Sequence, residues 1–230
     1  LSASDAIRSQ SSTAVPCIRA IAPMKRNICW TTMGARPVIT SSSEVYGKGV
    51  SVPFSEDDDR LMGPTHKLRW SYAAGKAVDE CLAQAYWQQH RLPVFIVRCF
   101  NTCGPRQSGA YGMVIPSMVQ RALAGEPIHV YGDGQQSRCF SAVQDVVRAL
   151  LMLSESAEAE GEVFNVGSDE ECSVLELAQR IKRMCHSDSS IQFMPYEQVY
   201  GQSFEDMRRR VPDLRKIRRV VGYRPQITLD

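Results

Sequence analysis

The chain has 230 residues, of which 43% are apolar and 23% are charged, so it can bury a core as one large domain or two small lobes. Its formal net charge of +2 gives no general electrostatic reason to bind nucleic acid, and no apolar run approaches the roughly 20 residues of a membrane-spanning helix. The eight cysteines contain no C-x-x-C pair, which argues against a zinc site and favours free thiols in a reducing compartment. We therefore expect a cytoplasmic protein with no metal, no nucleic-acid partner and no membrane contact.

Residues 1–36 differ in composition from the rest of the chain. They carry five basic side chains and one acidic side chain, and they show no sustained helical or strand period. A transit peptide has a similar composition, but this segment lacks a clean amphipathic stripe. We expect a disordered or foreign leader here, with order beginning near Pro37.

Two strands and a long helix are expected in the next part of the chain. The strands are predicted at Val38–Ser41 and within residues 92–101, and a polar loop rich in Pro and Gly follows the first strand. A helix is predicted at about Ser71–His90. Its apolar positions near helical spacing are Ala73, Ala77, Cys81, Leu82 and Ala85.

The second half of the chain continues this alternation. Residues 114–126 predict a helix that ends at Gly125, and residues 128–140 predict a hairpin that turns at Gly132–Gly134. The remaining predicted elements are helices within 141–156, 173–185 (with Ser173 as N-cap) and 213–222, and strands within 161–168 and 190–195. Strands that alternate with helices indicate an α/β fold with a mainly parallel sheet.

Tyr72 and Lys76 form a pair on the long helix. Residues four apart project from one face of a helix, so the phenol and the ammonium lie side by side. A nearby ammonium favours the phenolate form of a tyrosine, whose ordinary pKa of about 10 is too high for a base at neutral pH. The spacing is therefore one way to build a phenolate base, although amphipathic helices with a surface lysine also contain such pairs.

Polar side chains follow both predicted strands of this region. The segment SSSEVYG (Ser41–Gly47) comes after the first strand, and RCFNTCGPR (Arg98–Arg106) comes at the end of the second. Open α/β sheets bind their ligands at the carboxyl ends of parallel strands. We therefore expect both segments and the Tyr72–Lys76 pair to lie at the same edge of one sheet.

Six segments in consistent order carry a specific resemblance to a known family. They are SSSEVYG, YAAGK, VRCFNTCGPRQ, VYGDGQQSRCF, VFNVGS and RRRVPDLRKI, and they are spread over residues 37–230. Together they resemble the extended short-chain dehydrogenase/reductases, and more narrowly the NAD-dependent nucleotide-sugar epimerases, dehydratases and decarboxylases. The resemblance implies an α/β fold: the C-terminal part of a Rossmann-like parallel sheet plus a smaller α/β substrate-binding lobe.

The resemblance implies roles for four residues in catalysis and cofactor binding. Tyr72 is expected to take a proton from a sugar hydroxyl, and Ser42 to hydrogen-bond the same hydroxyl. Lys76 is expected to assist Tyr72 and, with it, to hold the nicotinamide ribose of NAD. Phe100 is expected to contact the same cofactor.

The resemblance also implies residues that bind a nucleotide-diphosphate sugar. Ser43 and Asn101 are expected at the sugar and its diphosphate, and Tyr131 at the nucleotide base. Arg138 and Arg210 are expected on the diphosphate, because the planar guanidinium grips phosphate oxygens in pairs.

Glu44 narrows the reaction that the resemblance implies. Plain 4-epimerases of the family usually have a small residue at this position, whereas UDP-glucuronate decarboxylases and some 4,6-dehydratases have Glu. Many dehydratases have Asp where this chain has Ser43, which favours decarboxylation of a UDP-sugar after transient oxidation at C4. A UDP-glucose 4-epimerase is the alternative enzyme. Glu44 is expected to be a catalytic carboxylate that can move a second proton beside the keto-sugar.

The resemblance divides the chain into five parts. They are an atypical leader (1–36), the remaining Rossmann core with the catalytic helix (37–108), a substrate-binding segment (109–142), a return to the core (143–166) and a C-terminal substrate lobe (167–230). The family's G-x-x-G-x-x-G turn for the NAD pyrophosphate is missing, and Gly34 is the only glycine before Gly47. We therefore expect a chain that lacks the family's N-terminal half and binds NAD poorly by itself.

Two further hypotheses remain open beside the enzyme. The chain could be an inactive module that keeps the nucleotide-sugar pocket, in which case UDP but not NAD would stabilise it. It could also act as a dimerisation partner only, because the family pairs through helices that include the Tyr72/Lys76 helix. Ala73, Ala77 and Cys81 are expected to face the second copy in a homodimer.

Overall fold

A computed structural model describes residues 36–109, 113–196 and 207–230. The predicted leader therefore lies, except for Arg36, outside the described residues. The segment Arg36–Asp230 forms one compact unit, to which the following description applies.

Three parallel strands form the central sheet, in the order β1–β2–β7. The strands are β1 (Val38–Ser42), β2 (Phe95–Cys99) and β7 (Val163–Val166). β2 pairs with β1 on one side and with β7 on the other, both in parallel. All three strands therefore present their carboxyl ends at the same edge of the sheet, as the sequence predicted.

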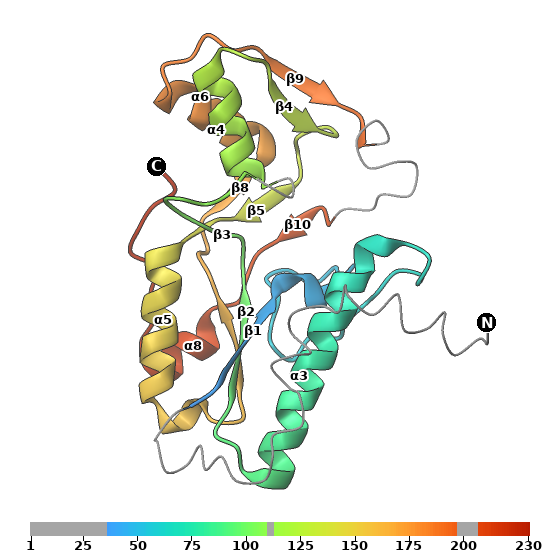
Figure 1. Ribbon diagram of the computed structural model, residues 1–230, viewed down its shortest axis with the longest axis vertical. Helices are drawn as coiled ribbons and strands as arrows, with labels where there is room; N and C mark the ends of the chain where they lie inside the picture. The colour runs from blue at the N-terminus through green and yellow to red at the C-terminus, as the bar shows by residue number, and fades with distance from the viewer. Residues whose placement is uncertain (1–35, 110–112, 197–206) are drawn as a thin grey trace, which may run out of the picture. The chain divides into compact units, whose positions relative to one another are not determined.

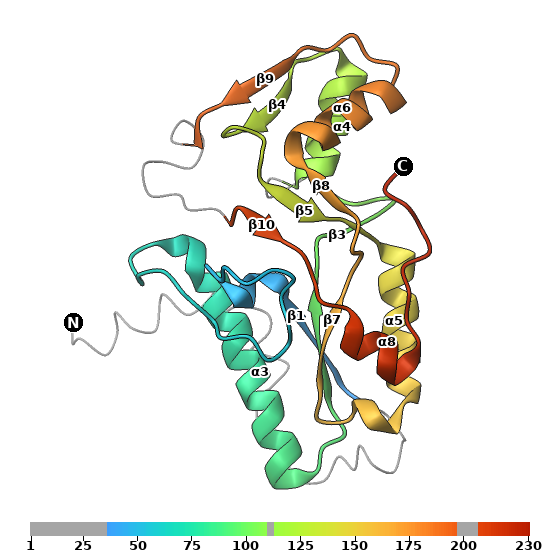
Figure 2. The same ribbon diagram turned by 180° about the vertical axis from the view of Figure 1, so that it is seen from behind.

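Helices cover both faces of this sheet (Figures 1 and 2). Helix α3 (Ser71–His90) lies on one face, and α5 (Val143–Glu155) and α8 (Arg215–Val221) lie on the other. The bounds of α3 are those predicted from the sequence. This layering is the one expected when β-strands alternate with helices.

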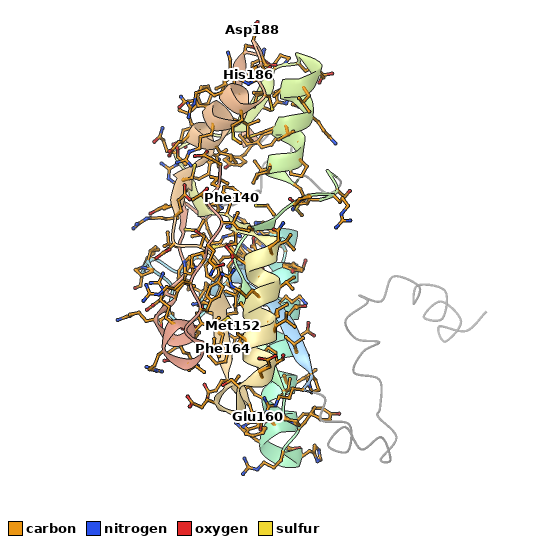
Figure 3. All side chains as sticks on the ribbon, turned by 90° about the vertical axis from the view of Figure 1, so that its left-hand side faces the viewer. Phe140, Met152, Glu160, Phe164, His186 and Asp188 are labelled. Atoms are coloured by element: carbon orange, nitrogen blue, oxygen red, sulfur yellow. The ribbon has the colours of Figure 1, made fainter. Side chains whose placement is uncertain are left out.

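Alternate residues of β2 face the two layers, because successive side chains of a strand point to opposite faces. Phe95 and Val97 belong to the core with α5 and α8, to which Phe164 also belongs. Ile96 belongs to the smaller cluster on the α3 side, together with Ala83. Figure 3 labels Phe164, which lies beside α5 and belongs to the same core as Ala149 and Leu153 of that helix.

A second hydrophobic core belongs to two helices and two strands (top of Figure 1). The elements are α4 (Val114–Ala124), β4 (Ile128–Tyr131), α6 (Val174–Met184) and β9 (Ile191–Met194). β4 and β9 pair in parallel, and their inner side chains pack against the two helices. Phe140, labelled in Figure 3, also belongs to this core.

Short strands link the elements of the two cores. β5 (Ser137–Cys139) lies between β10 (Arg209–Arg210), which is parallel to it, and β8 (Glu171–Ser173), which is antiparallel. β3 (Thr102–Cys103) pairs in parallel with β6 (Ser141–Ala142). Three 3-10 helices lie at residues 43–46, 68–70 and 157–159.

The hairpin predicted at residues 128–140 is wrong. The turn exists, with positive φ at Gly132 (69°) and Gly134 (72°), but the strands on either side of it join different sheets. Ile128 and Val130 are fully buried, so β4 pairs with β9 inside the second core and leaves β5 to pair elsewhere.

The other predicted helix boundaries agree with the structure. α4 and α8 end at Gly125 and Gly222, whose φ values of 70° and 68° are left-handed and therefore favour glycine. The hydroxyl of Ser173 accepts a hydrogen bond from the backbone N–H of Glu176, as an N-cap does. None of the helices in the described ranges is long and apolar enough to span a membrane.

Candidate active site

The bend after β1 places two serines and a glutamate at the carboxyl edge of the sheet. Ser42 has extended backbone (φ −147°) and its Oγ accepts a hydrogen bond from the N–H of Glu44 at 3.2 Å, which starts the 3-10 helix. The Ser42 hydroxyl proton is not used in this bond, so it can be donated to a ligand. Ser43, next in the chain, is 1% exposed.

Helix α3 lies against β1 and brings Lys76 to the end of that strand. The Lys76 Nζ donates to the carbonyl oxygen of Thr40 at 2.9 Å and lies 3.5 Å from the Asp79 carboxylate. Tyr72 is one helical turn earlier and is 54% exposed. The lysine is therefore attached to the strand two residues before Ser42, while the phenol remains accessible.

Glu44 is held between two arginines. Its carboxylate lies 2.5 Å from Nη1 of Arg69 and 2.8 Å from Nη2 of Arg210. Burial by itself raises the pKa of this carboxyl, but the guanidiniums of Arg210 and Arg69 outweigh it, so the pKa of Glu44 is below its ordinary value. The carboxylate is therefore ionised at neutral pH.

Arg210 also connects Glu44 to the end of the neighbouring strand. Its Nη1 lies 3.5 Å from both Ser43 Oγ and Asn101 Oδ1. Asn101 follows β2, has a positive φ of 36° and donates from Nδ2 to the Cys139 carbonyl oxygen at 2.9 Å. The ends of β1 and β2 and strand β10 thus meet at one place, as the sequence predicted for the two strand ends.

The two arginines predicted to bind a diphosphate are neighbours in the structure. Arg210 of β10 is the register partner of Arg138 of β5, and partners in a parallel ladder point to the same face. Both side chains are mostly buried, with 6% and 8% exposure. Tyr131, at the end of β4, is half-buried, and its carbonyl oxygen accepts a hydrogen bond from the Gln136 side chain.

Phe100 lies in the core of the chain. Its ring is 0% exposed and packs in a cluster with Tyr46 and Phe54. Its backbone N–H donates to the Val166 carbonyl, and its carbonyl accepts from the Ser141 hydroxyl, both at 3.0 Å. The ring is not placed to contact a ligand here, and the predicted cofactor contact stays a prediction.

Sequence reasoning missed Arg69 and the pair Glu80–Arg98. Arg69 lies one helical turn before Tyr72. This position beside the predicted catalytic residue is the only feature of the sequence that could have suggested Arg69 as a site residue. Glu80, one turn after Lys76, and Arg98 form an ion pair whose side chains are each 7% exposed. Both residues would ordinarily be assigned to the solvent-exposed surface.

Two hollows lie beside this cluster. One, of about 580 Å³, is lined by Lys48, Trp70, Arg208 and Arg209 among others, so it adjoins Arg69 and Arg210 along the chain. A smaller one of about 100 Å³ is lined by Asn101 and the beginning of α4. Within the described part of the chain, no group of three or more His, Cys, Asp or Glu side chains is placed to hold a metal ion.

Comparison with known proteins identifies the class. The model of a family described as GDP-mannose 4,6 dehydratase matches residues 4–230, a range that begins within the expected leader. The chain therefore belongs to this family, among the NAD-dependent epimerase/dehydratase members of the short-chain dehydrogenases/reductases. The α/β fold and the family resemblance predicted from the sequence are confirmed.

Two curated relatives illustrate the similarity. A UDP-N-acetyl-alpha-D-glucosaminuronate decarboxylase of Bacillus cytotoxicus is 46% identical over 88% of this chain and 63% of its own length. UDP-glucuronic acid decarboxylase 1 of Danio rerio is 38% identical over 86% of this chain and 45% of its own length. The chain thus spans about half the length of the curated relatives that it matches.

Solved structures share the fold. The dTDP-glucose 4,6-dehydratase DesIV from Streptomyces venezuelae, with NAD and TYD bound, is 30% identical with a TM-score of 0.72, over 84% of this chain and 56% of its own. A UDP-glucose 4-epimerase from Thermotoga maritima, with UDP-glucose, is 28% identical with a TM-score of 0.73, over 84% and 59%. These relatives catalyse different reactions on one fold, so the reaction must be argued from the site.

Proposed function

We propose that the chain carries the catalytic helix and the substrate-binding lobe of an NAD-dependent UDP-sugar decarboxylase that acts by transient oxidation of the sugar at C4. One observation carries this proposal. The Tyr72/Lys76 helix is attached to the end of β1 beside Ser42, and the ionised Glu44 lies two residues further, between Arg69 and Arg210. The names of the curated relatives support decarboxylation over the other reactions of the family.

The first role of the site is to remove a proton from the sugar 4-hydroxyl. Tyr72 is the proposed general base, and its side chain is accessible to the sugar at 54% exposure. Ser42 donates its hydroxyl proton to the same sugar oxygen and orients it. NAD, when bound, supplies the hydride acceptor for the oxidation and the donor for the later reduction.

Decarboxylation follows from the ketone at C4. The C5–C6 bond breaks, CO2 leaves, and its electron pair moves toward the ketone oxygen, after which C5 takes up a proton. Glu44 is a poor proton donor for this step because the arginines keep it ionised. Its proposed role is instead to hold Arg69 and Arg210 in place beside the sugar.

The diphosphate of the substrate is assigned to the adjacent side of the cluster. Arg138 and Arg210 are register partners, so two guanidiniums can grip phosphate oxygens together, with the Asn101 amide beside them. Ser43 is proposed at the sugar, and Tyr131 at the nucleotide base. A pyrophosphate is the group for which such paired, planar donors are suited.

The residues present fit one end of NAD. Lys76, which is bonded to the Thr40 carbonyl near the carboxyl end of β1, and Tyr72, one helical turn earlier, would hold the nicotinamide ribose. The sequence contains no G-x-x-G-x-x-G turn for the pyrophosphate. We therefore propose that these residues bind the nicotinamide ribose of NAD, and we assign no residue of this chain to its pyrophosphate.

Mass spectrometry of the reaction products tests the proposal. The purified chain, and a chimera that joins the N-terminal part of the Bacillus cytotoxicus relative to residues 37–230, are incubated with NAD and either UDP-glucuronate or UDP-glucose. We expect the chimera to release CO2 from UDP-glucuronate and to leave UDP-glucose unchanged, and we expect the chain itself, which is expected to bind NAD poorly, to form little product. An isobaric product from UDP-glucose would instead support the 4-epimerase. If UDP raises the melting temperature but neither protein forms a product, the inactive binding module is supported.

A homodimer through α3 is proposed as the assembly. The apolar side chains exposed on α3 include Val78 at 57% and Leu82 at 39%, together with Cys81. Ala73, which we had expected at the dimer contact, is fully buried against its own chain, so that expectation is wrong. Ala73 and Ala83 face the interior of the chain, whereas Val78, Cys81 and Leu82 are exposed on α3.

Replacing Val78 with glutamate should convert this dimer to a monomer, because a charge would be buried without a partner at the contact. Sedimentation velocity measures the change. The matched control is Leu123→Glu, since Leu123 is 71% exposed on α4 and lies outside the proposed contact. A parent chain that sediments as a monomer, or a control that dissociates equally, would contradict the proposal.

A further inference from the structure

Helix α3 carries a buried carboxylate that has no part in the chemistry above. Glu80 is 5% exposed and lies one turn beyond Lys76. Arg98 of β2, which is 6% exposed, donates to both of its oxygens, from Nη2 at 2.8 Å and from Nε at 3.0 Å. The pair therefore joins α3 to the central strand with two directional bonds.

Further bonds connect this pair to the rest of the sheet. Arg98 Nη1 donates to the Tyr46 hydroxyl at 3.0 Å, and its guanidinium lies 4.8 Å from the centre of the Tyr46 ring. The Tyr46 hydroxyl donates to Asn165 Oδ1 of β7 at 2.7 Å. The network thus includes α3, β2, β7 and the 3-10 helix that follows Ser42.

The same carboxylate is bonded to β1 directly beside the catalytic serine. Ser41 Oγ donates to Glu80 Oε1 at 2.5 Å, and Ser41 is the residue before Ser42. Lys76 makes the second link, to the carbonyl of Thr40 at 2.9 Å. Two polar links therefore join α3 to adjacent residues of β1, immediately ahead of Ser42.

Apolar packing alone would position the first half of this helix weakly, because the large apolar side chain of α3 that packs against the core, Trp87, lies near its far end. The buried residues of α3 are Ala73, Asp79, Glu80 and Ala83, so only two small apolar side chains are fully enclosed. Two alanines allow a helix to slide or rotate, whereas hydrogen bonds to a carboxylate have fixed lengths and directions. A buried ion pair is moreover often no more stabilising than an apolar pair of similar volume.

We propose that Glu80 is a positioning residue, which sets the rotation of α3 so that Tyr72 and Lys76 face Ser42. The inference rests on the proposed function, in which these three residues act on one sugar hydroxyl. Glu80 contacts neither substrate nor cofactor, and it acts through Ser41 on one side and Arg98 on the other.

The test measures the exposure of Lys76 as well as catalysis. Acylation of Lys76 by acetic anhydride is followed by mass spectrometry, with Lys182 of α6 as the internal reference. The variants are Glu80→Gln and Ser41→Ala, both made in the chain and in the chimera. We expect acylation of Lys76 to accelerate about fivefold relative to Lys182, which corresponds to one lost hydrogen bond. The kcat of the chimera should fall while its KM for the UDP-sugar remains unchanged.

Asp145 provides the matched control. It is also a buried carboxylate, 1% exposed, but it accepts from the backbone N–H groups of Gln226 and Ile227 on the α5 side. Asp145→Asn should lower the melting temperature without changing the acylation of Lys76. This control separates a general loss of stability from a local release of α3.

The proposal is overturned if the variants only melt earlier and keep both the parent acylation rate of Lys76 and the parent kcat. If Glu80→Gln does not fold, Ser41→Ala decides, because it removes one bond and leaves the Glu80–Arg98 pair intact. If Lys76 is acylated faster in the variants but the parent protein forms no product, the link between Glu80 and Lys76 is supported and the proposed function is contradicted. Failure of the positioning role of Glu80 and failure of the proposed function therefore give different results.

Discussion

Tyr72→Phe should lower the kcat for CO2 release from UDP-glucuronate by about 10²–10⁴, the usual contribution of a positioned acid–base group. The substitution removes a single oxygen from a side chain that is 54% exposed, so the fold should be unchanged. UDP should raise the melting temperature of the variant as much as that of the parent, because the proposed diphosphate contacts are elsewhere. The chimera with NAD is used for kcat, and the chain itself for binding.

Tyr86→Phe is the matched control for this experiment. Tyr86 lies on the same helix, with its ring 5.5 Å from that of His90, far along α3 from Ser42. Its hydroxyl has no role in the proposed mechanism, so kcat should not change. A Tyr72→Phe variant that retains the parent kcat would show that another group removes the proton, and the assignment of the base would be abandoned.

The order of the elements and the bounds of α3 could be predicted from the sequence because they depend on local patterns. Helical spacing, a glycine after each of two helices and a capping serine all act within a few residues of one another. The partner of a strand is not local. The turn at residues 132–134 indicated a hairpin, but the burial of Ile128 and Val130 in the second core made β9 the partner of β4.

The candidate site shows the same limit. The carboxyl ends of parallel strands must share one edge, so it could be expected from the sequence that Glu44 and Asn101, which both contact Arg210, lie near each other. The long side chain of Arg69 reaches Glu44, which is 25 residues earlier in the chain, and such a contact between distant residues leaves no local pattern in the sequence. Glu80 was overlooked because carboxylates are rarely buried unless paired, and its partner Arg98 belongs to another element.

Glu44→Gln should destabilise the chain by about 3 kcal/mol at neutral pH, the usual cost of removing one partner from a buried ion pair. Glutamine keeps the size of the side chain, but Arg69 and Arg210 lose the negative charge that now lies 2.5 and 2.8 Å from them. Urea denaturation monitored by circular dichroism measures the difference. The matched control is Glu176→Gln, because Glu176 pairs with Arg180 on the surface, where solvent screens the pair, and its loss should change the stability much less.

The pH dependence of this difference follows from the lowered pKa of Glu44. A carboxyl whose pKa is lower in the folded chain contributes stability fully above the unfolded value, about 4.3 for glutamate, and loses it as the pH falls through the folded value. Protonated Glu44 resembles glutamine, so the parent and the variant should converge in stability at pH values below the folded pKa. A difference that stays constant from neutral pH down to that range would mean that the charge of Glu44 is not what holds Arg69 and Arg210.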